Sequence, residues 1–298
     1  MQVTDSHDRI LSELEIRADP FAICTLEGIC SMGLGRNPRA TLHYVLAGRG
    51  HLTIQSRPPI ELTPGRLILV PACLTHSLRH DGDGDTNLPA CEPAGLNIQQ
   101  HRVSGKGDGS MTLLCSTVSL GLRNTHGLID LLQSPLSCDI SESAIADRAI
   151  RSLLAEMARP RVGRRAMVRA LLLQCVIEML RNRIEADDPS ALWLCGLTDP
   201  ALWRALRTML ENPGAIHSLE SLSEAAGMSR SRFAERFQQV YGQAPMSFLR
   251  DLRLARAAQL LTDGRDPIKR IAGKVGFSSR SAFTRAFTAS WGRSPREF

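Results

Sequence analysis

The sequence predicts an α+β protein with a β-rich N-terminal domain and an all-helical C-terminal domain. Three observations lead to this fold class. Short runs of strand-forming residues, broken by Gly and Pro, occupy residues 21–120. After Gly127 the apolar residues recur at helical spacing. The length of 298 residues exceeds what one hydrophobic core usually serves, so two domains are expected.

The β-rich region contains three clear strand candidates. Residues 41–46, 51–55 and 67–70 are apolar or alternating, and turn-forming Gly and Pro flank them. Short strands at regular spacing are typical of a sandwich or a barrel. The Gly- and Asp-rich segments 81–85 and 104–109 have little apolar surface to bury, so we expect exposed loops there.

Two longer segments, residues 143–157 and 164–184, then show helical periodicity. The second is apolar almost all round, so its own domain or a second copy of the chain must cover it, and we expect a homodimer. A polar, Pro-containing linker follows. The expected parts are a β-rich domain 1–126, a helical dimerisation segment 127–184, a linker 185–196 and a C-terminal domain 197–298.

The positive charge of the chain lies entirely in its last third. The net charge is +6, and residues 199–298 hold 16 Lys and Arg against 9 Asp and Glu. Such a segment favours a polyanion as partner, and charge alone leaves DNA, RNA and an anionic membrane open. No apolar run reaches the roughly 18 residues of a membrane span, and the first residues lack a secretory pattern. We therefore expect a cytoplasmic protein with no membrane partner.

The last hundred residues contain an internal repeat with a period of about fifty residues. In each copy a short helix ends at Gly and a bulky apolar residue follows. The next residue is a Ser, which we expect to be the N-cap of a second helix that carries two Phe at positions i and i+4. This order predicts a helix-turn-helix written twice. The copies are Leu222–Ser229 with Phe233 and Phe237, and Ile271–Ser278 with Phe283 and Phe287.

The helix faces opposite these Phe pairs are polar and basic. Arg bonds bidentately to guanine, Ser and Thr reach bases or phosphates, and a helix fits the major groove. An ordinary helical bundle also has a solvated polar face, but the duplication and the basic excess together favour double-stranded DNA. The predicted DNA-binding residues are Arg230, Ser231, Arg232, Ala234 and Glu235 in the first copy, and Ser279, Arg280, Ser281, Thr284 and Arg285 in the second.

A single helix is expected to join the two copies, over residues 244–261. Pro245 suits its first turn, and Gly264 suits its stop. Eighteen helical residues rise roughly 27 Å, close to the approximately 34 Å that separates successive major grooves on one face of B-DNA.

Over residues 197–298 the sequence resembles the AraC/XylS family of bacterial regulators. The resemblance implies a sequence-specific transcription regulator, with activation expected and repression as the alternative, and with RNA polymerase as a further partner. It assigns base reading to Ser231, Ala234 and Glu235 and to Arg280, Ser281, Thr284 and Arg285. The residues that carry it are Ala225–Ser229, Phe233, Phe237, Arg253–Ala257, Ile271–Ala272, Val275–Ser279, Phe283, Phe287 and Gly292–Phe298.

The β-rich domain looks like the cupin-type sensor domain that often precedes such DNA-binding domains. Gly65–His80 keeps the Gly, Pro and His of the second cupin motif, with Cys73 and His80 in place of Gly and Asn. The two His and the Glu of the first motif correspond here to Gly35, Asn37 and Thr41. We therefore expect no metal and no cofactor, with a reduced metal site of His43, Cys73 and His76 as the alternative. The same three residues are expected in an effector pocket.

The sequence leaves several functions open for this domain. A small effector bound inside a barrel can bias two domain arrangements. A thiol switch is the rival, with Cys24, Cys30, Cys91 and Cys115 as candidates among eight cysteines that lack zinc-site spacing. A cupin metalloenzyme with a DNA-binding tail needs at least three metal ligands close together. A helical adaptor that binds no DNA is the remaining alternative.

Overall fold

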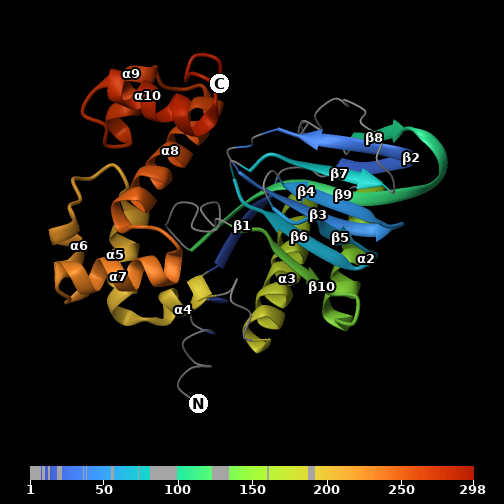
Figure 1. The fold of residues 1–298 in the computed structure, drawn as a ribbon. Coiled ribbons are helices and arrows are strands. Elements are labelled where there is room, and N and C mark those ends of the chain that lie inside the picture. Colours follow the sequence, from blue (N-terminus) through green and yellow to red (C-terminus); the bar gives the residue numbers. More distant parts are fainter. Residues whose placement is uncertain are drawn as a thin grey trace. The chain divides into compact units, whose positions relative to one another are not determined.

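The computed structural model divides the chain into two compact units (Figure 1). The barrel unit comprises residues 16–119 and 134–187, and the helical unit comprises residues 1–15, 120–133 and 188–298. The structure describes residues 8, 11–12, 14–18, 22–35, 37, 39–54, 57–72, 74–80, 99–122, 134–159, 161–186 and 192–298.

The described strands form one sheet that curves into a nearly closed barrel (Figure 1). Its order is β10-β6-β3-β9-β2-β7-β4-β5, with β1 paired to β9 and β8 paired to β2. The β2–β8 pair is parallel, and the other pairs of known register are antiparallel. The strands are β1 (Leu14–Ala18), β2 (Ala22–Leu34), β3 (Ala40–Ala47), β4 (Gly50–Ile54), β5 (Ile60–Leu62), β6 (Arg66–Val70), β7 (His76–His80), β8 (Gln99–Ser104), β9 (Lys106–Leu122) and β10 (Leu136–Asp139).

The three strands expected from the sequence, at 41–46, 51–55 and 67–70, are confirmed as β3, β4 and β6. Strand β2 shows the physical reason for the barrel, because its side chains alternate between the core and the outer face. Its inward residues Cys24, Leu26 and Met32 are at most 1% exposed. The interior is therefore packed with apolar side chains from several strands.

The prediction of an exposed loop at residues 104–109 is wrong. Strand β8 ends at Ser104 and β9 begins at Lys106, which pairs with Ile29 of β2. The side chains here are exposed as expected, but the backbone is held in the sheet, for example by the Gly105 amide, which donates to the Glu27 carbonyl at 2.7 Å. Backbone pairing with a distant strand does not depend on apolar side chains. Segment 81–85 lies outside the described residues.

Helices α2 (Ala144–Ala158) and α3 (Arg164–Glu185) belong to the barrel unit and match the two predicted helical segments. They pack against each other, and α3 packs against β10 (Figure 1). Both helices have buried apolar side chains, for example Leu153 and Leu172. The Ser143 hydroxyl caps α2 by accepting from the Ala146 amide and donates to Glu178 of α3.

The helical unit contains α4 (Leu192–Thr198), α5 (Pro200–Glu211), α6 (Leu219–Ala226), α7 (Arg230–Tyr241), α8 (Pro245–Asp263), α9 (Ile268–Lys274) and α10 (Arg280–Trp291). Helix α4 begins inside the expected linker 185–196, since the apolar Trp193 finds a buried site and is 5% exposed. Helix α8 runs between the group α5–α7 and the group α9–α10 (Figure 1). Among the described helices, none has the length and apolar character of a membrane span.

Candidate nucleic-acid interface and sensor site

The first helix-turn-helix has the local chemistry that its sequence predicts. Helix α6 ends at Gly227, which adopts the left-handed conformation with φ 67°. The Met228 amide then donates to the Ser223 carbonyl at 3.0 Å, which satisfies the end of the helix. The Ser229 hydroxyl caps α7 by accepting from the Arg232 amide at 3.4 Å. Helix α7 therefore begins at a fixed point and in a fixed direction.

The second unit repeats this design with one difference. Helix α9 is followed by the left-handed Gly276, with φ 79°, and the Phe277 amide donates to the Ala272 carbonyl at 2.9 Å. The cap of α10 is Ser279, which accepts from the Ala282 amide at 3.1 Å, so the prediction of Ser278 is wrong. The second turn is one residue longer than the first, and this residue moves the cap by one position.

The four repeated phenylalanines anchor the second helix of each unit. Phe233, Phe237, Phe283 and Phe287 are all 0% exposed, as predicted. The ring centroids lie 5.6 Å apart in the first pair and 5.5 Å apart in the second. Phe237 also meets Phe248 of α8 edge-to-face at 5.4 Å. Because this face is locked inward, the opposite face of each helix must point to solvent.

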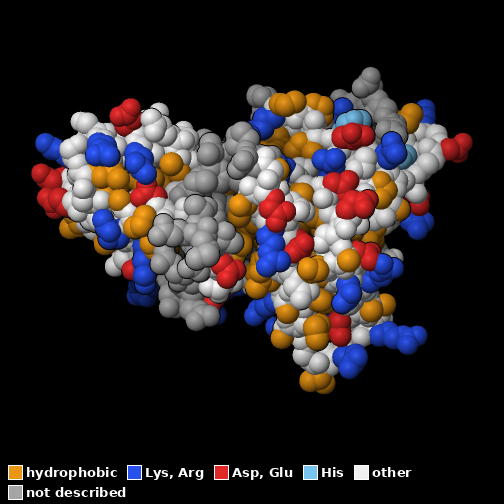
Figure 2. Space-filling model, turned by 90° about the horizontal axis from the view of Figure 1, so that it is seen from below, with side chains coloured by type: hydrophobic (Ala, Val, Ile, Leu, Met, Phe, Trp, Pro, Cys, Tyr) orange, Lys and Arg blue, Asp and Glu red, His pale blue; other side chains and the backbone are white. Residues whose placement is uncertain are grey.

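The predicted DNA-binding residues lie on these outer faces and at the first turn or cap of each helix. All are exposed except Ala234 and Thr284, which are half-buried. Among the described residues, none forms an ion pair with Arg230, Arg232, Arg280 or Arg285, so these cations remain available to phosphates or bases. Figure 2 shows Lys and Arg side chains on the surface of the helical unit, with apolar ones between them.

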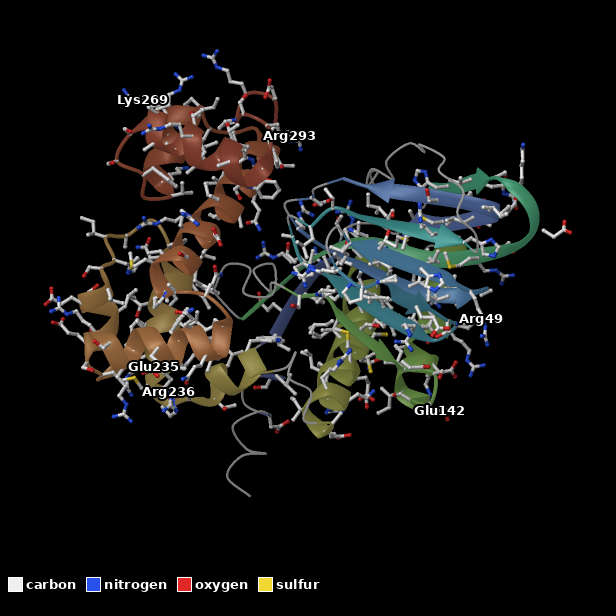
Figure 3. All side chains as sticks on the ribbon, viewed as in Figure 1. Arg49, Glu142, Glu235, Arg236, Lys269 and Arg293 are labelled. Carbon is white, nitrogen blue, oxygen red and sulfur yellow. The ribbon has the colours of Figure 1, made fainter. Side chains whose placement is uncertain are left out.

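Two arginines that the sequence analysis did not single out hold the first unit together. Arg204 of α5 donates to the carbonyls of Ala225 and Ala226, at 3.0 and 3.3 Å, and so caps the end of α6. Arg236 of α7 pairs with Asp199 at 2.6 Å; Figure 3 labels Arg236 beside Glu235. In the sequence such an arginine is only a weak signal of a structural role, because the residue that it contacts lies far away along the chain.

The connector is confirmed as the single helix α8. Pro245 occupies its first turn, and Gly264 ends it in the left-handed conformation with φ 64°. Its 19 residues rise about 28 Å.

The barrel interior contains a chain of hydrogen-bonded polar side chains. The His76 Nδ1 lies 3.2 Å from the Leu74 carbonyl, the His43 Nε2 lies 2.9 Å from the His76 Nε2, and the His43 Nδ1 lies 3.2 Å from the Cys115 Sγ. The Thr41 hydroxyl lies 3.4 Å from the same His76 Nε2. The structure thus joins His43 and His76 of the predicted pocket and adds Thr41 and Cys115.

The carbonyl at one end of this chain decides where its protons lie. The Leu74 oxygen only accepts, so the Nδ1 of His76 carries a hydrogen. In neutral His76 the Nε2 then accepts, which makes the His43 Nε2 a donor and the His43 Nδ1 an acceptor. The Cys115 thiol therefore donates to His43.

Burial keeps both imidazoles neutral. It lowers the pKa of His76 from 6.5 to about 4, although the bond to Leu74 acts in the opposite direction. It also lowers the pKa of His43 well below 6.5, and the neighbouring His76 adds to this shift. The polar centre of the barrel is thus uncharged near neutral pH.

The structure does not bring all predicted barrel residues to one point. Cys24 and Cys30 are buried in the same apolar core as Cys115, and Cys73 and Cys91 lie outside the described residues. The Cys30 thiol donates to the Val103 carbonyl at 3.7 Å, and burial raises the pKa of this thiol. Within the described part of the chain, no group of three or more His, Cys, Asp or Glu could hold a metal ion.

We expect the barrel to lose stability as the pH falls from about 6.5 to about 4. The unfolded histidines take up protons in this range, whereas the folded ones do not, so stability is complete above 6.5 and the loss from His76 approaches about 3 kcal/mol. Urea-dependent hydrogen exchange of the β3 amides measures the free energy of unfolding. His76→Gln should reduce the pH dependence, and the exposed control His51→Gln should not. An equal pH dependence in wild type and His76→Gln would contradict the assignment.

Comparison with known families covers most of the chain. Residues 6–185 match the Cupin family, and residues 222–298 match the helix-turn-helix domain family. The two matches correspond to the barrel with its helices and to the repeated units with α8.

The chain also aligns with curated relatives over most of their length. The chain is 26% identical to the HTH-type transcriptional regulator AlkR of Acinetobacter baylyi, over 99% of this chain and 98% of the relative. It is 30% identical to the RCS-specific HTH-type transcriptional activator RclR of Escherichia coli, over 86% of this chain and 82% of the relative. Among solved structures, ToxT from Vibrio cholerae shares the fold, with a TM-score of 0.51 at 12% identity, covering 95% of this chain and 97% of ToxT.

Three findings indicate the same family: the duplicated, Phe-anchored helix-turn-helix, the cupin barrel and the named relatives. The chain therefore belongs to the AraC-family transcription regulators with an N-terminal cupin domain, and it regulates transcription by binding DNA.

Proposed function

We propose that the chain is a cytoplasmic, homodimeric activator whose helices α7 and α10 enter two consecutive major grooves of one DNA duplex. The observation that carries this proposal is the duplicated burial of Phe pairs, which leaves one polar, basic face exposed on each helix. The 28 Å rise estimated for α8 is compatible with grooves about 34 Å apart. A regulator bound upstream of a gene acts on RNA polymerase, which we propose as the second macromolecular partner.

The proposed contacts fall into two classes. Arg280 and Arg285 suit guanine, Glu235 suits the amino group of cytosine, and Ala234 suits the methyl group of thymine. Ser231, Ser281 and Thr284 complete the base-reading set. We assign the other three predicted residues, Arg230, Arg232 and Ser279, to phosphates, because Arg and Ser side chains bond readily to phosphate oxygens.

For the barrel we propose sensing by a small organic effector, and no catalytic role. His43, His76 and Thr41 offer uncharged donors and acceptors inside an apolar wall, a combination that binds small molecules. The ToxT structure was solved bound to (E)-4-(8-methylnaphthalen-1-yl)but-3-enoic acid, which supports a small organic ligand as the class of effector. The named relatives are regulators, which supports a sensor rather than an enzyme.

For the dimer we propose the exposed side of α3. Met167 is 48% exposed there, Ala166 and Ala170 are exposed, and Leu173 and Ile177 are half-buried. These positions recur at helical spacing and form one apolar stripe. Figure 2 shows apolar side chains among the charged ones on the barrel unit. A second copy of the same stripe would bury it symmetrically.

The proposed DNA reading predicts two protected segments, about one helical turn apart, in a footprint on the DNA upstream of the chain's own gene. Arg280→Ala should weaken binding by about 1–3 kcal/mol and relax the sequence preference at one position. Arg232→Ala should weaken binding equally on all sequences and reduce its salt dependence.

The matched control is Arg207→Ala, since Arg207 pairs with Glu211 on α5 and is assigned no DNA contact. Transcription from the same DNA by purified RNA polymerase should rise when the protein is added. A single protected segment, or an unchanged preference in Arg280→Ala, would overturn the two-groove reading, and repression in the transcription assay would overturn the activator assignment.

The effector proposal predicts that mild treatment with hydrogen peroxide leaves the count of free thiols unchanged. Cys30 and Cys115 are 2% and 5% exposed, and buried thiols react slowly with oxidants. Intact mass and thiol alkylation before and after treatment provide the measurement. A loss of two hydrogens accompanied by altered DNA binding would instead favour the switch, with Cys24, Cys30, Cys91 and Cys115 as the residues to map.

The dimer proposal predicts that Met167→Glu weakens self-association, because two carboxylates would meet in an apolar interface. Sedimentation velocity over a range of concentrations measures the monomer fraction. Met246→Glu is the control, since Met246 is also apolar and 39% exposed but lies in the helical unit. Equal dimerisation of Met167→Glu and wild type would rule out this face.

A further inference from the structure

A loop that precedes the first helix-turn-helix contacts the connector helix. This loop, residues 212–217, joins α5 to α6. Arg253, near the middle of α8, donates from Nε to the Pro213 carbonyl and from a terminal nitrogen to the Ala215 carbonyl, both at 2.8 Å. Pro213 itself is buried. One guanidinium thus fixes the loop at two points that are two residues apart.

The same loop also contacts the turn of the second helix-turn-helix. A Cβ atom built on Gly214 would lie 2.1 Å from the Lys274 carbonyl oxygen. A Cβ atom on Gly276 would lie 2.8 Å from the Gly214 carbonyl oxygen and 2.9 Å from the Arg253 guanidinium. Such distances leave no room for a side chain, so the two backbones touch directly. Gly276 is the left-handed residue of the second turn.

These contacts define a three-way junction, which we name the 214–253–276 junction. It consists of the loop at Gly214 from the first unit, Arg253 from α8, and the turn at Gly276 from the second unit. Among the described residues, Arg253 forms no ion pair with a carboxylate, so its hydrogen-bonding capacity goes to backbone carbonyls. Burial of the guanidinium lowers its pKa and strengthens its dependence on these two acceptors.

A single connector helix does not by itself fix two reading heads. The first unit packs on α8 through Phe237 and Phe248, and the second unit packs on it through α9 and α10. The junction adds a direct contact between the two units, and two bodies joined at separate places cannot turn about one of them.

We propose that Arg253 is a positioning residue for DNA recognition, which sets the spacing and relative orientation of α7 and α10 through the 214–253–276 junction. The inference rests on the proposed two-groove reading and extends it to the device that holds the grooves in register. The expected effect is a higher effective concentration of the second unit at its groove. When the first unit is bound to DNA, a rigidly held second unit already faces the next groove, whereas a loosely held one must search for it.

The test compares two DNA duplexes and uses the full-length protein. The first is a duplex selected by the wild-type protein from random sequence, and the second has five base pairs, about half a helical turn, inserted between the two protected segments. Wild type should bind the second duplex at least about a hundredfold more weakly, since the avidity of two linked modules is lost when geometry forbids their simultaneous contact.

Arg253→Met should bind the first duplex about tenfold more weakly than wild type and lose most of the discrimination between the two duplexes. Arg253→Lys should discriminate between the duplexes less than wild type and more than Arg253→Met, because an ammonium group lacks the planar fork that reaches two carbonyls. Arg250→Met is the matched control: it removes one charge from an exposed site on the same helix, and it should keep the full discrimination. A fall in stability alone would lower the active fraction without changing the ratio between the duplexes.

Gly214→Ala provides an independent route if Arg253→Met does not fold. It keeps Arg253 but forces the loop away from Lys274, and it should also reduce the discrimination. Wild-type discrimination in a folded Arg253→Met or Gly214→Ala protein would overturn the role of the junction. Absence of spacing dependence in wild type itself would instead overturn the two-groove reading, so the two failures are distinguishable.

Discussion

The burial of two Phe pairs at positions i and i+4 is the constraint on which DNA recognition in this protein depends. Each ring pair fixes the rotation of its helix about the helix axis, and this rotation decides which side chains face solvent. Phe237 and Phe287 also reach beyond their own helices, to Phe248 and to Phe298. The polar face is therefore displayed by the same packing that stabilises the unit.

The barrel follows a different principle, in which a few polar groups are held inside an apolar core. Such groups are tolerated only when they are hydrogen-bonded, and the chain from Leu74 through His76 and His43 to Cys115 meets this condition without a formal charge. Because both imidazoles in this series of hydrogen bonds are neutral, each of their nitrogens has a definite role as donor or acceptor. A bound effector that replaces one of these bonds would change the stability of the surrounding strands, which suits a sensor.

Local patterns in the sequence were good predictors wherever a residue's role depends on its near neighbours. Gly227 and Gly276 take the left-handed conformation in their turns, and Pro245 and Gly264 bound the connector. Prediction failed where one inserted residue or a distant strand intervened. The longer second turn moved the cap to Ser279, and pairing with β2 drew residues 104–109 into the sheet. Neither effect produces a recurring spacing of apolar residues in the sequence, so periodicity cannot reveal it.

The sequence by itself determined the fold class, the duplicated helix-turn-helix and the faces that its helices expose, because periodicity, capping and turn chemistry act over a few residues. Only the tertiary structure decided which distant groups meet. It placed His43 between His76 and Cys115, and it placed Arg253 between the Pro213 loop and Gly276. These contacts join residues tens of positions apart, and their geometry depends on how whole strands and helices pack, which no local pattern encodes.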